Sequence, residues 1–162
     1  MKRIVLFAII FFVVITFAFS QDTNEWNWGG LVRFRPAATI ITAIFGGFEI
    51  VADWIPYVTP NIGIPVEIDF LSIGGLFGFG IMAGIEAVPI IHKEKSGLYL
   101  TALLGALFID KYTTFCGRAN VGYQIVSNGG FVFTPAIGAK YSGMSGISFD
   151  LMLDIGFAYR KR

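Results

Sequence analysis

The final stretch of the chain alternates strictly between apolar side chains and polar or small ones. The apolar positions are Ile147, Phe149, Leu151, Leu153, Ile155, Phe157 and Tyr159. Between and after them come Ser148, Asp150, Met152, Asp154, Gly156, Ala158 and Arg160. Successive side chains of a β-strand point to opposite faces, so this period of two predicts a strand with one apolar face and one polar face. Several such strands can close into a barrel whose inner and outer surfaces differ in polarity.

The first twenty residues have the features of a secretory signal peptide. Lys2 and Arg3 precede an apolar run, and Ala18 and Ser20 place small residues at the two positions that a signal peptidase inspects. The run is shorter than the roughly 20 residues that a spanning helix needs. We therefore expect residues 1–20 to be a cleaved signal peptide and residues 21–162 to form one domain, with a retained N-terminal anchor as the alternative.

The composition argues against several classes of function. Of the 162 residues 55% are hydrophobic and 14% charged, and the formal net charge of +1 gives no indication of nucleic-acid binding. The single Cys116 cannot form an internal disulfide, and one cysteine with one histidine cannot supply the usual set of metal ligands. His92 falls in a charged turn and has no arrangement typical of nucleophilic catalysis. We expect no cofactor and no enzymatic activity.

Long uncharged stretches that could suggest membrane helices are interrupted by helix-breaking residues. Residues 70–85 contain five glycines, and residues 119–139 contain Asn128, Gly129 and Pro135. Such sequences favour strands joined by turns. Turn signals divide the chain into eight predicted strands, each edge being uncertain by a few residues. They run over residues 31–45, 48–57, 61–70, 76–90, 98–109, 116–126, 131–141 and 147–160.

Wherever a predicted strand carries several charges, those charges fall on one face. This face is expected to line the lumen of an all-β, eight-stranded antiparallel up-and-down transmembrane barrel with short turns. The expected lumen network consists of Arg33, Arg35, Glu49, Asp53, Glu67, Asp69, Glu86, Arg118, Lys140, Asp150, Asp154 and Arg160. An eight-stranded barrel is only about wide enough for its own side chains, and an unpaired buried charge loses its hydration. We therefore expect a salt-bridged plug in place of an open pore.

Three further expectations concern particular segments. Residues 98–109 are apolar on both faces, which predicts a local apolar patch in the lumen. The turn over residues 110–115 is expected to be the largest on the side opposite the termini. Aromatic residues at the side of the termini are expected to form a girdle at the membrane boundary. They are Trp26, Trp28, Trp54, Phe157 and Tyr159.

The mature chain as a whole resembles the small bacterial outer-membrane barrels, the class of the OmpA transmembrane domain and OmpX. The terminal strand, Asp154 to Tyr159, is similar to the C-terminal signal read by the barrel assembly machinery, although here Arg160, Lys161 and Arg162 follow the last aromatic residue. The resemblance implies a monomeric barrel in outer-membrane lipid, inserted by that machinery and structural or surface-related in role. Two alternatives stay open: a narrow porin-like channel for small solutes, and a soluble lipocalin-like barrel that binds an apolar ligand.

Overall fold

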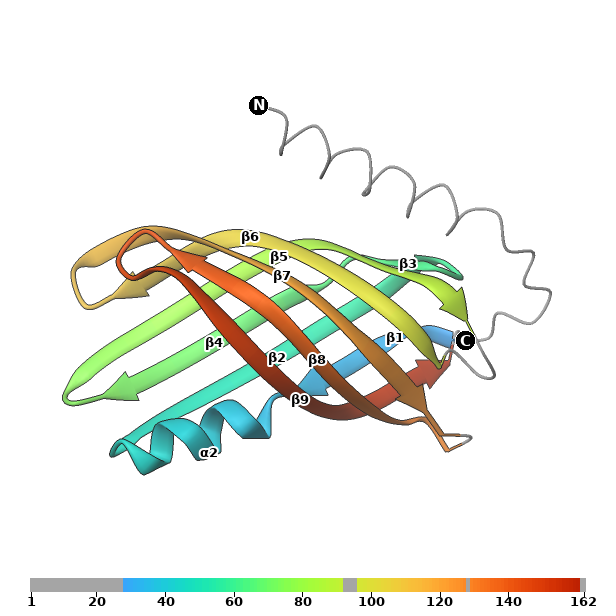
Figure 1. The fold of residues 1–162 in the computed structure, drawn as a ribbon, viewed down its shortest axis with the longest axis horizontal. Helices are drawn as coiled ribbons and strands as arrows, with labels where there is room; N and C mark the ends of the chain where they lie inside the picture. The colour runs from blue at the N-terminus through green and yellow to red at the C-terminus, as the bar shows by residue number, and fades with distance from the viewer. Residues whose placement is uncertain (1–27, 92–95, 128, 161–162) are drawn as a thin grey trace.

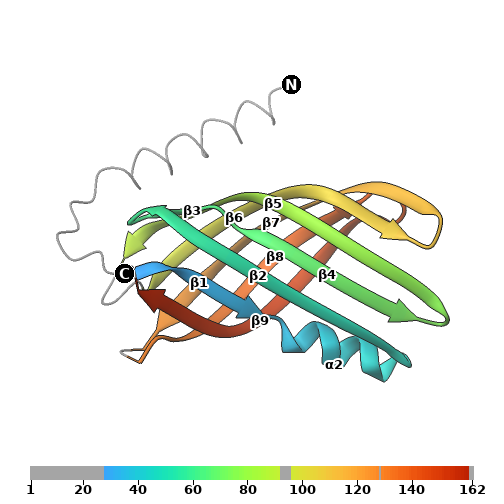
Figure 2. The same ribbon diagram turned by 180° about the vertical axis from the view of Figure 1, so that it is seen from behind.

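The computed structural model describes residues 28–91, 96–127 and 129–160. Their strands form one antiparallel sheet that curls round and closes on itself (Figures 1 and 2). The elements are β1 (Trp28–Phe34), α2 (Pro36–Ile44), β2 (Gly47–Thr59), β3 (Ile62–Gly63), β4 (Val66–Ile73), β5 (Leu76–Ile91), β6 (Gly97–Ile109), β7 (Tyr112–Val126), β8 (Phe131–Ser142) and β9 (Gly146–Arg160). Among the described residues, no helix has the length and apolarity needed to cross a membrane.

Closure depends on β1, which pairs with β2 on one side and with β9 on the other. Arg33 of β1 lies opposite Asp53 on β2 and opposite Gly156 on β9. Around the rest of the ring, each long strand pairs antiparallel with the next in the sequence, and the two-residue β3 is inserted between β2 and β5. The predicted eight-stranded antiparallel barrel is confirmed, with one short strand added.

The two ends of the barrel differ in their connections. The first described residue, Trp28, and the last, Arg160, lie together at what we call the terminal end (Figure 1). At the opposite end, the helix end, lie α2 and three tight turns. One turn is Gly74-Gly75, whose φ values of 58° and 83° suit a two-residue hairpin. Another is Asp110-Lys111, so the expected turn over residues 110–115 was too long, because β7 already begins at Tyr112.

The prediction of one strand over residues 31–45 was wrong in its second half. β1 ends at Phe34, and the next residues form the helix α2. Pro36 occupies the start of the helix, where its fixed φ is favourable and its missing N–H is not needed. Gly46, with φ of 73°, follows the C-cap and adopts the left-handed conformation that often ends a helix. These end signals outweigh the strand preference of the isoleucines and threonines between them, and the first connection is consequently not short.

Because β1 is short, part of the barrel wall is made by a helix. Only residues 155–160 of β9 pair with β1, and the preceding residues 146–154 pair with β8 alone. α2 lies beside β2 and β9 at this point (Figures 1 and 2). The Thr42 hydroxyl donates to the Glu49 carboxylate at 2.7 Å, which ties α2 to β2. Within the described residues, no backbone hydrogen bond joins α2 to β9.

The predicted strand over residues 61–70 is also divided in two. Pro65 separates β3 from β4, because proline has no N–H to offer a neighbouring strand. Its carbonyl still accepts a hydrogen bond from the Gly84 amide at 3.1 Å, and the Ile64 amide donates to the Pro56 carbonyl at 2.9 Å. The ring therefore stays connected across the interruption.

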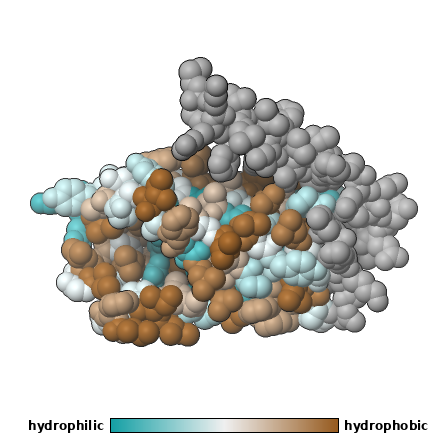
Figure 3. Space-filling model, viewed as in Figure 1, coloured by the Kyte–Doolittle hydropathy of each residue, from teal (hydrophilic) through white to brown (hydrophobic). Residues whose placement is uncertain are grey.

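Side chains alternate between the lumen and the outer surface as the sequence pattern predicts. On β9, Phe149 is 93% exposed and Phe157 is 63% exposed, whereas Asp154 is 2% exposed. Hydrophobic side chains are spread over the outer wall (Figure 3). Aromatic rings pack along this outer surface, as between Phe70 and Phe79, whose centroids are 5.0 Å apart. The large apolar side chains of the described strands thus lie mainly on the outer surface.

Replacing Gly84 with alanine is expected to destabilise the barrel. A Cβ atom at this position of β5 would collide with the backbone carbonyl of Ala102 on the paired strand β6, which cannot move aside cheaply. We expect Gly84→Ala to lower the free energy of unfolding by about 2 kcal/mol, within the range for overpacking. Urea titration of the folded protein in detergent measures the change.

The matched control is Gly78→Ala on the same strand, where the added Cβ would lie at an ordinary contact distance of 3.4 Å from Ile109. We expect this variant to unfold within about 0.5 kcal/mol of the unaltered protein. Equal stability of the two variants would show that the close approach of β5 and β6 does not constrain Gly84.

Candidate functional site

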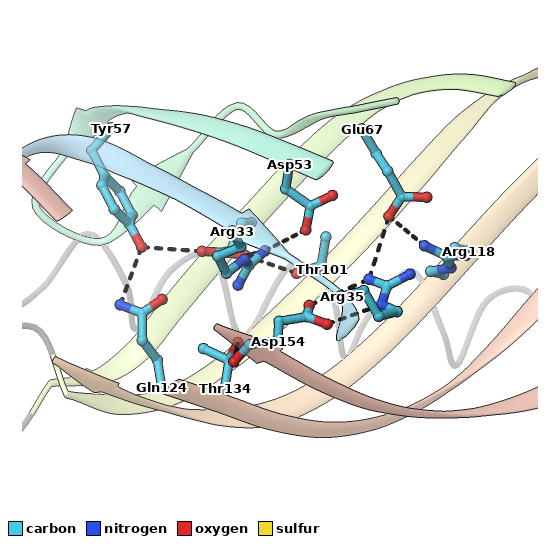
Figure 4. A network of polar contacts seen from close by, with 11 residues as sticks. Arg33, Arg35, Asp53, Tyr57, Glu67, Thr101, Arg118, Gln124, Thr134 and Asp154 are labelled. Carbon is cyan, nitrogen blue, oxygen red and sulfur yellow. Dashed lines mark hydrogen bonds and ion pairs between the residues drawn. The ribbon is translucent and has the colours of Figure 1, made fainter. Parts of the chain in front are cut away.

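Most of the lumen is filled with side chains. At the terminal end it holds an apolar cluster of Leu31, Ile55, Tyr57, Val88, Tyr99, Val126, Val132, Ala136 and Met152. A smaller cluster inside β5, β6 and β7 consists of Met82, Leu103, Leu107 and Cys116. Two of its members, Leu103 and Leu107, come from residues 98–109, in agreement with the apolar lumen patch predicted there. Charged side chains occupy the remaining middle and helix-end part of the bore (Figure 4).

Arg33 and Glu86 form the centre of the first group of polar contacts. The Arg33 Nη2 lies 2.7 Å from Glu86 Oε2 and 3.3 Å from Asp53 Oδ2. The Tyr57 hydroxyl donates to Glu86 Oε1 at 3.0 Å, and the Thr101 hydroxyl donates to Glu86 Oε2 at 3.1 Å. Glu86 is fully buried, and these three donors replace the water that its carboxylate has lost.

Glu67 is the centre of the second group. Its Oε2 accepts from Arg118 Nη1, and it lies 3.5 Å from Arg35 Nη2 (Figure 4). Arg35 in turn donates through Nε to Asp154 Oδ1 at 3.0 Å. One carboxylate on β4 therefore joins the arginine between β1 and α2 to an arginine on β7, across the bore.

Towards the helix end the ion pairs become partly exposed. Lys140 Nζ lies 3.2 Å from Asp69, with 24% of the lysine side chain exposed. Asp150, whose side chain is 28% exposed, lies 3.6 Å from Arg118 Nε. Glu49 accepts from the Thr42 hydroxyl of α2. These outer groups keep contact with solvent, whereas Glu67 and Glu86 have little or none.

Eleven of the twelve residues in the predicted lumen network lie inside the barrel wall, buried or half-buried. The side chain of Arg160 lies outside the described part of the structure. Sequence reasoning did not include Tyr57, Tyr99 and Thr101, which also face the bore. Tyr57 has the same parity as Asp53 on β2, so the alternation rule could have identified it.

Carboxylates outnumber cationic groups in the described lumen. Seven acids face four bases, and three carboxylate oxygens are buried without a hydrogen-bond partner. They are Asp53 Oδ1, Glu67 Oε1 and Asp69 Oδ1. The arrangement is therefore an acid-rich network of ion pairs that links strands across the bore.

Neither the described residues nor known proteins identify a further site. No group of three or more His, Cys, Asp or Glu is placed to hold a metal ion within the described ranges. His92 and the predicted signal peptide over residues 1–20 lie outside them. Comparison with models of known families, with curated proteins and with solved structures finds no match.

Replacing Glu67 with glutamine is expected to be among the most destabilising changes in the lumen. The variant leaves Arg118 without its principal partner and weakens the pairing of Arg35. Breaking a buried pair by removing one partner typically costs about 3–5 kcal/mol. We expect a loss of that size in the free energy of unfolding, measured by urea titration in detergent.

Asp110→Asn is the matched control, because Asp110 is an exposed acid in the turn between β6 and β7. Its replacement is expected to change the free energy of unfolding by no more than about 0.5 kcal/mol. The network would have no structural importance if Glu67→Gln unfolded at the same urea concentration as this control.

Proposed function

We propose that the protein is an integral outer-membrane β-barrel with a salt-bridged, largely plugged lumen and a structural or surface role in the cell envelope. The observation that carries the proposal is the distribution of polarity: charged side chains point into the barrel and large apolar ones point out. An eight-stranded membrane barrel needs this arrangement, because lipid surrounds it and its interior is polar.

The lengths of the strands support the same proposal. β2, β5, β6, β7, β8 and β9 have between 12 and 16 residues each. A tilted strand needs about 9–11 residues to cross a bilayer. At the terminal end, Trp54 donates to the Tyr159 hydroxyl at 3.1 Å on the exposed surface, and Phe157 lies nearby on β9. Such residues suit a membrane–water boundary.

The proposed location also sets the route by which the protein arrives there. Residues 1–20 would direct export and be removed, and the barrel assembly machinery would insert the remaining chain as a monomer. β9 runs to Arg160 and pairs with both β1 and β8, so its insertion completes the ring. In this account outer-membrane lipid is the lasting partner of the barrel.

The alternatives have less support. A soluble barrel that binds an apolar ligand needs an apolar cavity and a polar exterior, which is the reverse of the burial observed on β9 and β4. A channel needs an open bore, whereas Tyr99, Gln124 and Met152 are almost completely buried within this one.

Fractionation of cells that express the protein tests the proposal. We expect the folded protein in the membrane pellet after an alkaline carbonate wash, and we expect detergent to be needed for its release. Its migration in a gel should change on boiling, because a closed barrel resists detergent until it is heated. Recovery in the soluble periplasmic fraction would contradict the proposal.

A pair of arginine substitutions separates a membrane barrel from a soluble one. Ile137 on β8 is 61% exposed on the outer wall, and Met144 is 54% exposed in the turn that follows β8. Arginine at a lipid-facing midplane position costs about 2–4 kcal/mol, and much less near the interface. Ile137→Arg should therefore reduce the heat-modifiable membrane form, and Met144→Arg should not. Equal recovery of both variants would speak against lipid around β8.

A further inference from the structure

A cleft of about 190 Å³ opens where α2 takes the place of the missing half of β1. α2 contributes Ile41 to its lining and β9 contributes Phe149. Arg118 of β7 and Lys140 of β8 line it from the lumen, together with Arg35. The cleft thus joins the outer apolar surface to the charged interior.

The outer rim of the cleft is strongly apolar. Phe149 is 93% exposed and Ile41 is 53% exposed, and neither packs into the lumen. Between them the wall has no continuous ladder of backbone hydrogen bonds, because residues 146–154 of β9 pair only with β8. A molecule carried by the surrounding lipid could therefore approach the cleft from the side of the barrel.

The inner part of the cleft offers hydrogen-bond donors that are not used. Arg35 and Arg118 are each only 5% exposed, yet Arg35 Nη1 has no hydrogen-bond partner, and Arg118 Nε makes only a long ion-pair contact of 3.6 Å to Asp150 Oδ2. The charges of both guanidinium groups are already compensated by Glu67, that of Arg35 also by Asp154 and that of Arg118 also by Asp150. What remains unsatisfied on each arginine is an N–H group that needs an acceptor.

The surrounding charges restrict the kind of acceptor. Glu49 and Asp150 also line the cleft, and the described lumen already holds three more carboxylates than cationic groups. An anionic ligand in the cleft would be repelled by these acids. A cationic head would face Lys140 and the two arginines and could not accept from their N–H groups. An uncharged oxygen acceptor is not repelled by the acids, and it can accept hydrogen bonds from the arginine N–H groups.

We propose that this cleft binds a single-chain amphipath with an uncharged, oxygen-rich head, such as a monoacylglycerol. Its carbonyl or hydroxyl oxygens accept from Arg35 and Arg118, and its hydrocarbon chain lies along Ile41 and Phe149. The inference rests on the proposed membrane location, since the bilayer supplies such molecules to a lateral opening.

Isothermal titration calorimetry of the folded protein in maltoside micelles tests this binding, with empty micelles as the blank. Three probes share an eight-carbon chain and differ in head charge: monooctanoylglycerol, octanoate and octylammonium. We expect saturable binding of monooctanoylglycerol, and at least tenfold weaker binding of the other two. Tighter binding of either charged probe, or no saturable heat with monooctanoylglycerol, would overturn the proposal.

Two pairs of variants locate the site. Arg118→Lys keeps the charge beside Glu67 but removes the Nε donor, whereas Arg33→Lys makes the same change at a buried arginine outside the cleft. Ser148→Trp fills the cleft, and Ser145→Trp places the same ring in the exposed turn before β9. We expect roughly tenfold weaker binding in the first member of each pair only. Equal losses within a pair would contradict a site in the cleft.

A failure of the proposed ligand binding can be distinguished from a failure of the proposed membrane location. A protein that fractionates with membranes and changes its migration on boiling, but gives no saturable heat with monooctanoylglycerol, would remain a membrane barrel without this site. A protein recovered from the soluble fraction would remove the basis of both proposals.

Discussion

A barrel of eight strands leaves almost no room for bulk water, so each charge that lies deep in the lumen must find its partner within the bore. The pairing of Glu67 with Arg118, and of Arg33 with Glu86, meets this requirement. Each link also crosses the lumen, the first from β4 to β7 and the second from β1 to β5. The charges that the fold has to accommodate therefore also hold opposite walls at a fixed separation.

The same constraint explains why the outer surface is apolar. Because side chains alternate along a strand, a strand that points its charged residues into the bore leaves its other, apolar face on the outside. In the proposed membrane location lipid surrounds this surface, and a closed ring of strands satisfies its backbone groups there. The part of the ring beside α2 departs from this plan, since a helix replaces strand pairing along part of β9. That departure creates the lateral cleft.

The alternation of polar and apolar neighbours made the face of most side chains predictable from the sequence. The contacts between residues far apart in the chain were not predictable in this way. The faces of Glu67 and Asp154 follow from their neighbours one residue away, so the alternation was sufficient to orient them. Their partners depend on strand tilt and stagger, and nothing in the sequence pairs Arg33 with Glu86, which is 53 residues away. The helix α2 was missed because its isoleucines and threonines favour strands, although Pro36 and Gly46 mark its two ends. Tyr57 was missed because a tyrosine side chain can face either the lumen or the outer surface.

The most direct test of the account is a spin-label scan along the outer face of β9 in lipid vesicles. Single cysteines, in a Cys116→Ser background, replace Phe149, Leu151, Leu153, Ile155 and Phe157 in turn. The account predicts that relaxation by dissolved oxygen, which concentrates in the bilayer, exceeds relaxation by a water-soluble nickel complex, most strongly at the central positions. Stronger relaxation by the nickel complex at Leu151, Leu153 and Ile155 would contradict it, because these side chains would then face water.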